Sequence, residues 1–116
     1  MSLDVTLFMK IDTGGEDPYE VELFSANYTH NCGKSARGAG IYEYVWRPDE
    51  LDHVKVAGDL IEPLKSGIKL MEDSPERFEL LNPENGWGSY DSFLPWLKRY
   101  LDACIRHPKA EIHACR

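Results

Sequence analysis

The sequence is short of basic residues and of long apolar runs. Thirteen lysines and arginines face twenty aspartates and glutamates, which gives a net charge of −7. Nucleic acids and anionic membranes both require a basic surface, so we expect no DNA, RNA or membrane partner. No apolar run approaches the roughly 18 residues of a membrane span. The first ten residues place Asp4 early and have no basic segment, so no signal peptide is expected.

Cysteine is also scarce. The three cysteines, Cys32, Cys104 and Cys115, are odd in number, and no two of them have the C-x-x-C spacing. This pattern argues against a disulfide framework and favours the reducing cytoplasm. Cys104 falls in an apolar helical pattern, which indicates a small core residue.

The chain of 116 residues, 42% of them hydrophobic, has the length and apolar content of one domain, residues 1–116. Residues 3–10 alternate between apolar and polar, and residues 19–25 alternate again after a glycine-rich loop, which predicts an antiparallel hairpin. Residues 110–115 alternate as a third strand. We expect this last strand to pair beside the first.

Helical patterns occupy the chain between the hairpin and the last strand, over 31–39, 41–46, 57–71, 75–81 and 90–106. Thr29 or Asn31 is expected to cap the first of these helices. Pro63 either kinks the third or lies in its first turn. The order predicts an α+β fold in which a three-stranded antiparallel sheet packs against about four helices on one face.

The charge is uneven along the sequence. Residues 27–47 contain Lys34, Arg37 and Arg47 against Glu43 alone, a net +2 in an otherwise acidic chain. A helix N-terminus near Asn31 would add unpaired N–H groups, so the segment predicts a site for an anion. The alternative is that these bases pair with acids at the surface.

Two short motifs carry the most versatile side chains. In Tyr28-Thr29-His30-Asn31, His30 could act as acid, base or hydrogen-bond donor, although a simple capping turn explains the motif equally well. In residues 85–90, which run from Asn85 to Tyr90, Trp87 offers a flat face on which a base or sugar could stack. The alternative is that Trp87 covers the edge of the core.

Three further arrangements are weaker. Arg47 follows Tyr42, Tyr44 and Trp46 and could bind a phosphate, although Trp46 fits the core better. The pairs His30/Cys32 and His113/Cys115 match no common zinc spacing, so no metal site is expected. Cys32 or Ser35 with His30 lacks the context of a catalytic nucleophile.

Several longer motifs resemble a known family. These are Tyr28-Thr29-His30-Asn31, Ala39-Gly40-Ile41-Tyr42, Trp46-Arg47-Pro48, Gly58-Asp59-Leu60-Ile61 and the run from Asn82 to Tyr90. They are similar to motifs in a family of small uncharacterised phage, prophage and bacterial proteins, and they cover most of the chain. The sequence departs from the family at Cys32 and Ser35, where larger apolar residues are usual. The resemblance implies a small acidic protein of the host cytoplasm that works by binding, by analogy with phage proteins that counter host defence by sequestering nucleotide-derived signals.

The leading hypothesis is a binding protein, with no cofactor, for an anionic small molecule such as a nucleotide or a nucleotide-derived signal. Its site would lie between segment 28–47 and the 85–90 loop and would use Tyr28, His30, Asn31, Lys34, Arg47, Asn85, Trp87 and Tyr90. One alternative is a small hydrolase or transferase with His30 as general base. Another is an inhibitor whose acidic surface binds a basic protein. A homo-oligomer is left open.

Overall fold

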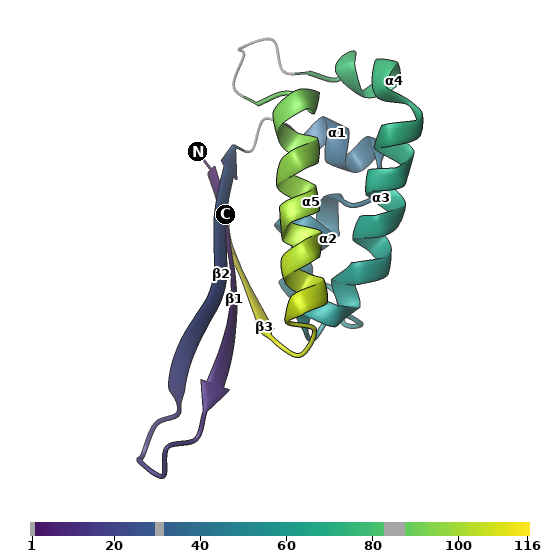
Figure 1. Cartoon of the computed structure of the whole chain (residues 1–116). Helices are drawn as coiled ribbons and strands as arrows, with labels where there is room; N and C mark the ends of the chain where they lie inside the picture. The colour runs from purple at the N-terminus through teal and green to yellow at the C-terminus, as the bar shows by residue number, and fades with distance from the viewer. Residues whose placement is uncertain (1, 30–31, 83–87) are drawn as a thin grey trace.

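A three-stranded antiparallel sheet forms one layer of the molecule. In the computed structural model, which describes residues 2–29, 32–82 and 88–116, the strands are β1 (Ser2–Ile11), β2 (Tyr19–Thr29) and β3 (Glu111–Cys115). Their order is β2-β1-β3, so β1 lies in the centre and the last strand pairs beside the first (Figure 1). The α+β prediction and the placing of the last strand are both confirmed.

Helices make up the second layer and cover one face of the sheet (Figure 1). The described residues form α1 (Gly33–Gly38), α2 (Tyr42–Trp46), α3 (Ile61–Asp73), α4 (Pro75–Glu79) and α5 (Tyr90–Arg106). Short 3-10 turns, η2 (Pro48–Glu50) and η3 (Ala57–Leu60), join α2 to α3. The long helices α3 and α5 pack against each other, and each buries one apolar side, as their sequence periodicity predicts.

The alternation of β1 decides which face of the sheet is buried. Leu3, Val5 and Leu7 are fully buried beneath the helices. They pair with Tyr28, Ala26 and Phe24 on β2, and a bulge between Leu7 and Phe8 then shifts the register so that Phe8 pairs with Glu22. The bulge lets β2 run to Thr29, four residues beyond the predicted end of the strand.

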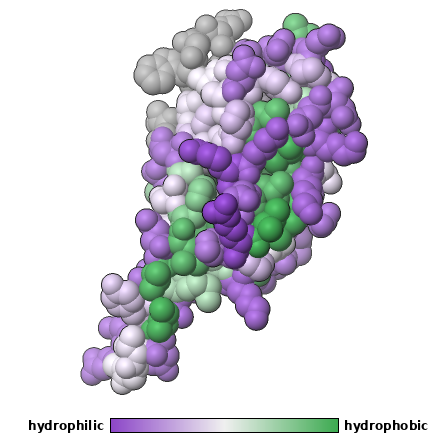
Figure 2. All heavy atoms as spheres, viewed as in Figure 1, coloured by the Kyte–Doolittle hydropathy of each residue, from purple (hydrophilic) through white to green (hydrophobic). Residues whose placement is uncertain are grey.

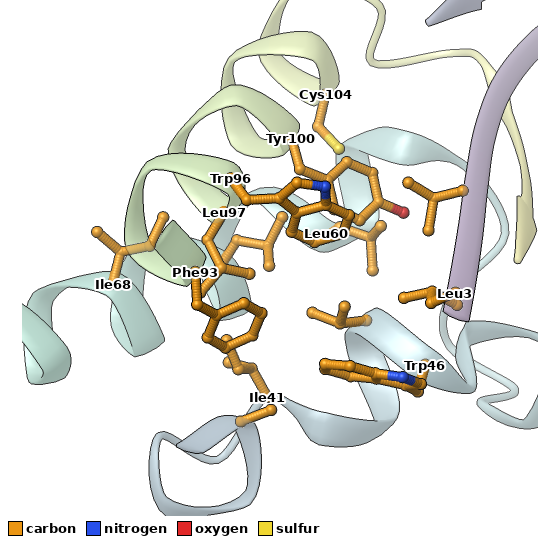
Figure 3. Packing of buried hydrophobic residues seen from close by; sticks show 14 of the residues in the cluster. Leu3, Ile41, Trp46, Leu60, Ile68, Phe93, Trp96, Leu97, Tyr100 and Cys104 are labelled. Atoms are coloured by element: carbon orange, nitrogen blue, oxygen red, sulfur yellow. The ribbon is translucent and has the colours of Figure 1, made fainter. Parts of the chain in front are cut away.

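Aromatic rings fill the space between the two layers. Phe93, which is fully buried, lies 5.2 Å from the Tyr28 ring, 5.9 Å from that of Trp46 and 6.2 Å from that of Trp96, measured between centroids. Figure 3 shows this cluster reaching from α5 toward Leu3 on β1. The Trp96 indole N–H also donates to the Asn27 carbonyl at 3.1 Å, so α5 is fixed to the end of β2 that carries the candidate site.

Several local predictions can now be judged. The residue that caps α1 is Cys32, so the prediction of Thr29 is wrong: Thr29 is still in β2 because the bulge prolongs that strand. Asn31 lies outside the described residues. Pro63 is the third residue of α3, so it belongs to the first turn, where no backbone N–H is needed. Pro95 lies further inside α5 than expected, in its second turn, and is exposed there.

Within the part of the chain that the structure describes, the Tyr100 hydroxyl has no hydrogen-bond partner, although the side chain is fully buried between α5 and β1 (Figure 3). An unsatisfied buried hydroxyl costs roughly 1–3 kcal/mol. Tyr100→Phe should therefore raise the free energy of unfolding by about 1 kcal/mol, measured by urea unfolding. Tyr90→Phe is the matched control and should lower it, because the Tyr90 hydroxyl donates to the Met71 carbonyl at 3.0 Å. A loss of stability in Tyr100→Phe would contradict the orphaned hydroxyl.

Candidate functional site

The end of β2 meets the start of α5 at Tyr28. Its hydroxyl lies 2.5 Å from Ser92 Oγ and 3.6 Å from Cys32 Sγ, and the Ser89 N–H donates to it at 3.4 Å. We call Tyr28, Cys32, Gly88, Ser89 and Ser92 the Tyr28 junction. It brings together two chain segments that are sixty residues apart in the sequence, as the sequence hypothesis requires.

Gly88 makes this contact close. Its φ of +90° belongs to the left-handed region, and a Cβ placed on it would lie 2.7 Å from Thr29 Cγ2 and 3.0 Å from Cys32 Sγ. Only glycine fits such a conformation and such an approach. His30 and Asn31 follow Thr29 directly in the chain, and Trp87 precedes Gly88. These three candidates are therefore sequence neighbours of the two residues, Thr29 and Gly88, that approach each other here. With Asn85, they lie outside the described residues.

The junction supplies hydrogen bonds and shape rather than a reactive nucleophile. Burial raises the pKa of Tyr28 to about 12, against the opposing effect of the Ser92 hydrogen bond. Burial also raises the pKa of the Cys32 thiol, whose residue is only 1% exposed. Both groups are protonated at neutral pH, and a buried thiol is inert. Ser35 is equally buried and its hydroxyl has no hydrogen-bond partner among the described residues, so it fits a core position better than a catalytic one.

A basic surface adjoins the junction through Cys32 and Gly33. The Arg37 guanidinium stacks over the Tyr42 ring at 4.0 Å from its centroid, and the Tyr42 ring stacks in turn on Trp46. Lys34 precedes Arg37 by one helical turn and is exposed. Within residues 2–29, 32–82 and 88–116, neither Lys34 nor Arg37 forms an ion pair. Two unpaired cations are thus left on α1.

Arg47 follows α2 directly in the chain. Its hydrogen bond to Glu50, at 2.7 Å, is the main cause that raises the pKa of Arg47, and the Tyr42 side chain adds to the effect. We call Lys34, Arg37, Tyr42 and Arg47 the basic strip. Arg47 differs from the two bases of α1 because Glu50 already neutralises it.

Tyr90 faces α3 instead. Its hydroxyl donates to Met71 in α3, and its N–H donates to Asn82 Oδ1 at 2.8 Å. The Ser89 carbonyl accepts from the N–H groups of Ser92 and Phe93, at 3.2 and 2.8 Å. Most of the first-turn N–H groups of α5 are thus satisfied within the chain. Side chains, and not this helix end, would have to hold an anion.

The described part of the chain contains no group of three histidine, cysteine, aspartate or glutamate side chains placed to hold a metal ion. His113 and Cys115 lie on β3, whereas Cys32 is buried at the start of α1. Among the described residues, Cys32 thus lies on a different element from His113 and Cys115, and His30 lies outside the described residues.

No family model, curated protein or solved structure matches the chain. The resemblance to small phage and bacterial proteins thus stays a prediction. Across the residues with described structure, no helix combines the length and the apolar character needed to cross a membrane. What the molecule does must be argued from its own geometry.

Sequence reasoning missed part of this site. The motif of residues 85–90 includes Gly88, but the site expected from the sequence includes neither Ser92 nor the contact that joins Arg37 to Tyr42. One signal is present in the sequence: Ser89 and Ser92 are three residues apart at the start of α5, and the Ser92 hydroxyl accepts from the Ser89 N–H at 3.1 Å, as in one half of a capping box. The stacking of Arg37 on Tyr42 depends on the turn between α1 and α2, which no periodicity specifies.

Proposed function

We propose that the protein binds an anionic small molecule, a nucleotide or a nucleotide-derived signal, on the surface where the basic strip adjoins the Tyr28 junction. The observation that carries the proposal is the stacking of the Arg37 guanidinium on Tyr42, 4.0 Å from the ring centroid, beside the exposed Lys34 of the same helix, in the net-basic segment of an acidic chain. Guanidinium groups suit phosphate because they present several donors in a fixed plane.

Each part of the surface would have its own role. Lys34 and Arg37 carry unneutralised charge and would bind the phosphate. Arg47 would contribute less charge because Glu50 pairs with it. His30, Asn31, Asn85 and Trp87 adjoin the junction in sequence and would add polar and stacking contacts to ribose and base. The protonated state of Cys32 and the buried hydroxyl of Tyr28 favour binding over turnover.

The protein would act in the cytoplasm, in the host if it is encoded by a phage, where sequestering a signal would counter defence.

A thermal-shift screen of cyclic dinucleotides, ADP-ribose and simple nucleotides tests the proposal. A ligand in excess over its Kd should raise the Tm by several degrees. Lys34→Ala/Arg37→Ala should weaken its binding about tenfold or more, since two charge-assisted contacts are removed. Lys65→Ala/Lys69→Ala makes the same change of charge on α3 and should leave binding unaltered.

Two results would overturn the proposal. One is the absence of a shift with every ligand of the screen at millimolar concentration. The other is equal binding by both double variants, which would place the ligand elsewhere. Mass spectrometry of the ligand recovered from the complex separates binding from catalysis. An unchanged ligand is expected, whereas a chemically altered one would favour the hydrolase or transferase alternative.

A further inference from the structure

The hairpin of β1 and β2 extends beyond the helices as an arm. β3 pairs only with Asp4 to Phe8 of β1, so the far end of the hairpin has no third strand. Figure 1 shows this end projecting past the helical layer. We call residues 9–21 the arm. Ile11 and Tyr19, which pair with each other there, are 48% and 65% exposed.

One face of the arm is apolar. Met9 pairs with Val21 and Ile11 pairs with Tyr19, and all four side chains lie on the face that Leu7 and Val5 bury further along the same strand. We call these four residues the arm stripe. It continues the core face of the sheet: Met9 is partly buried against the core, whereas Ile11 and Tyr19 are exposed, and Figure 2 shows hydrophobic atoms running along the projecting hairpin. In soluble proteins, exposed apolar surface on a strand commonly marks a site where another chain docks.

The arm is also strongly acidic. Residues 9–21 contain four acids against Lys10 alone, a net charge of −3, and these acids are Asp12, Glu16, Asp17 and Glu20. An occupant of the arm stripe must therefore combine apolar surface with positive charge. At physiological ionic strength the Debye length is about 8 Å, so the charges beside the contact decide the interaction and the net charge of the whole molecule matters less.

The chain itself carries a surface of that composition, next to the base of the arm. A hollow of about 240 Å³ lies between β2 and α5, where Leu23, Phe24 and Ala103 provide its apolar lining. Its charged residues are Arg99, Arg106 and Asp102, with His107 beside them. Asp102 pairs with Arg106 at 3.1 Å, whereas Arg99 has no ion pair within the described structure. Lys109 follows in the exposed turn before β3.

We propose that the occupant of the arm is a second copy of this chain. In a two-fold dimer each arm stripe would pack on the partner's arm and hollow, and each acidic arm tip would face the partner's Arg99 and Lys109. The same surface is used on both copies, as a closed two-fold interface requires. Within one copy, the arm stripe is continuous with the lining of the hollow through Leu23. The two contacts between an arm stripe and the partner's hollow would therefore join into one interface. This dimer is independent of the proposed anion site on α1 and α2.

Charge exchange between the two surfaces gives a direct test. The arm variant Glu16→Lys/Asp17→Lys and the groove variant Arg99→Glu/Lys109→Glu alter only exposed residues. Sedimentation velocity should show a dimer for the wild type and a monomer for each variant alone, because like charges then face each other. An equimolar mixture of the two variants should restore the dimer, since Lys then meets Glu at one contact and the native charges meet at the other.

The control variant, Lys65→Glu/Lys69→Glu, reverses the charge on α3 and should stay dimeric. Ile11→Ser/Tyr19→Ser should be monomeric and folded, as circular dichroism can verify. A monomeric wild type at about 100 μM, well above the Kd of a specific interface, would overturn the proposal. So would a dimer that both charge variants retain, or a mixture of the variants that stays monomeric.

Discussion

Gly88→Ala should lower the free energy of unfolding by about 2–5 kcal/mol. The φ of +90° costs a residue with a Cβ roughly 1–2 kcal/mol, and forcing a methyl group into a filled space costs a further 1–3 kcal/mol. The space is filled because Thr29 Cγ2, Cys32 Sγ and the Tyr28 hydroxyl lie 2.7, 3.0 and 3.2 Å from the position of that Cβ. Urea unfolding followed by tryptophan fluorescence measures the loss.

Gly14 and Gly40 provide matched controls for this substitution. Their φ angles, +87° and +75°, are similar, but nothing lies within 4 Å of a Cβ at either position. Gly14→Ala and Gly40→Ala should therefore show the conformational cost alone, about 1–2 kcal/mol. If Gly88→Ala is no more destabilising than these two, the close contact between the end of β2 and the start of α5 does not exist. The juxtaposition on which the anion site depends would then be lost as well.

Gly67→Ala should be destabilising by about 1–2 kcal/mol, although helix propensity predicts the opposite. In the middle of a helix alanine is better than glycine by roughly 1 kcal/mol. Gly67, however, is the point at which α3 receives Ile41, and a Cβ there would lie 2.5 Å from Ile41 Cγ2. The cost of overpacking, roughly 1–3 kcal/mol, exceeds the gain. Differential scanning calorimetry should record a lower Tm.

A double-mutant cycle separates these two contributions. Ile41→Ala removes the atoms that a Cβ on Gly67 would meet, so Gly67→Ala should be neutral or stabilising in that background. The coupling energy should lie in the range of about 0.5–3 kcal/mol found for residues in contact. Ser66→Ala, on the exposed side of the same helix, should be nearly neutral. Additive effects at Gly67 and Ile41 would contradict the packing of the α1–α2 turn against α3.

Most of the fold could be predicted from periodicity. The alternation of β1 specified its buried face, since Leu3, Val5 and Leu7 are all fully buried. Residues 90–106 were expected to be helical, and α5 has those bounds. Two-residue and near-four-residue periods are imposed by backbone geometry, so they can be recognised without any tertiary structure.

Irregular features could not be predicted in this way. The bulge after Leu7 inserts one residue into β2 and reverses the alternation of apolar and polar residues there. A sequence pattern with a period of two residues therefore does not continue into the second half of the strand. Thr29, one of the two residues that the sequence offers as a helix cap, belongs to this half of the strand. For the candidate site, residue type and local charge pointed to segment 27–47, but the stacking of Arg37 on Tyr42 depends on tertiary packing.

The central place of β1 in the sheet also bears on how the protein is made. Val5 and Leu7 pair on one side with a strand that follows within some twenty residues, and on the other with Ala114 and Ile112. During synthesis the hairpin can therefore form early, whereas one edge of β1 has no partner until residues 111–115 have left the ribosome. Contacts this distant in sequence close slowly. Until then the unpaired edge of β1 can aggregate. We expect chaperones, or the charge of the acidic hairpin, to protect the nascent chain from aggregation during this time.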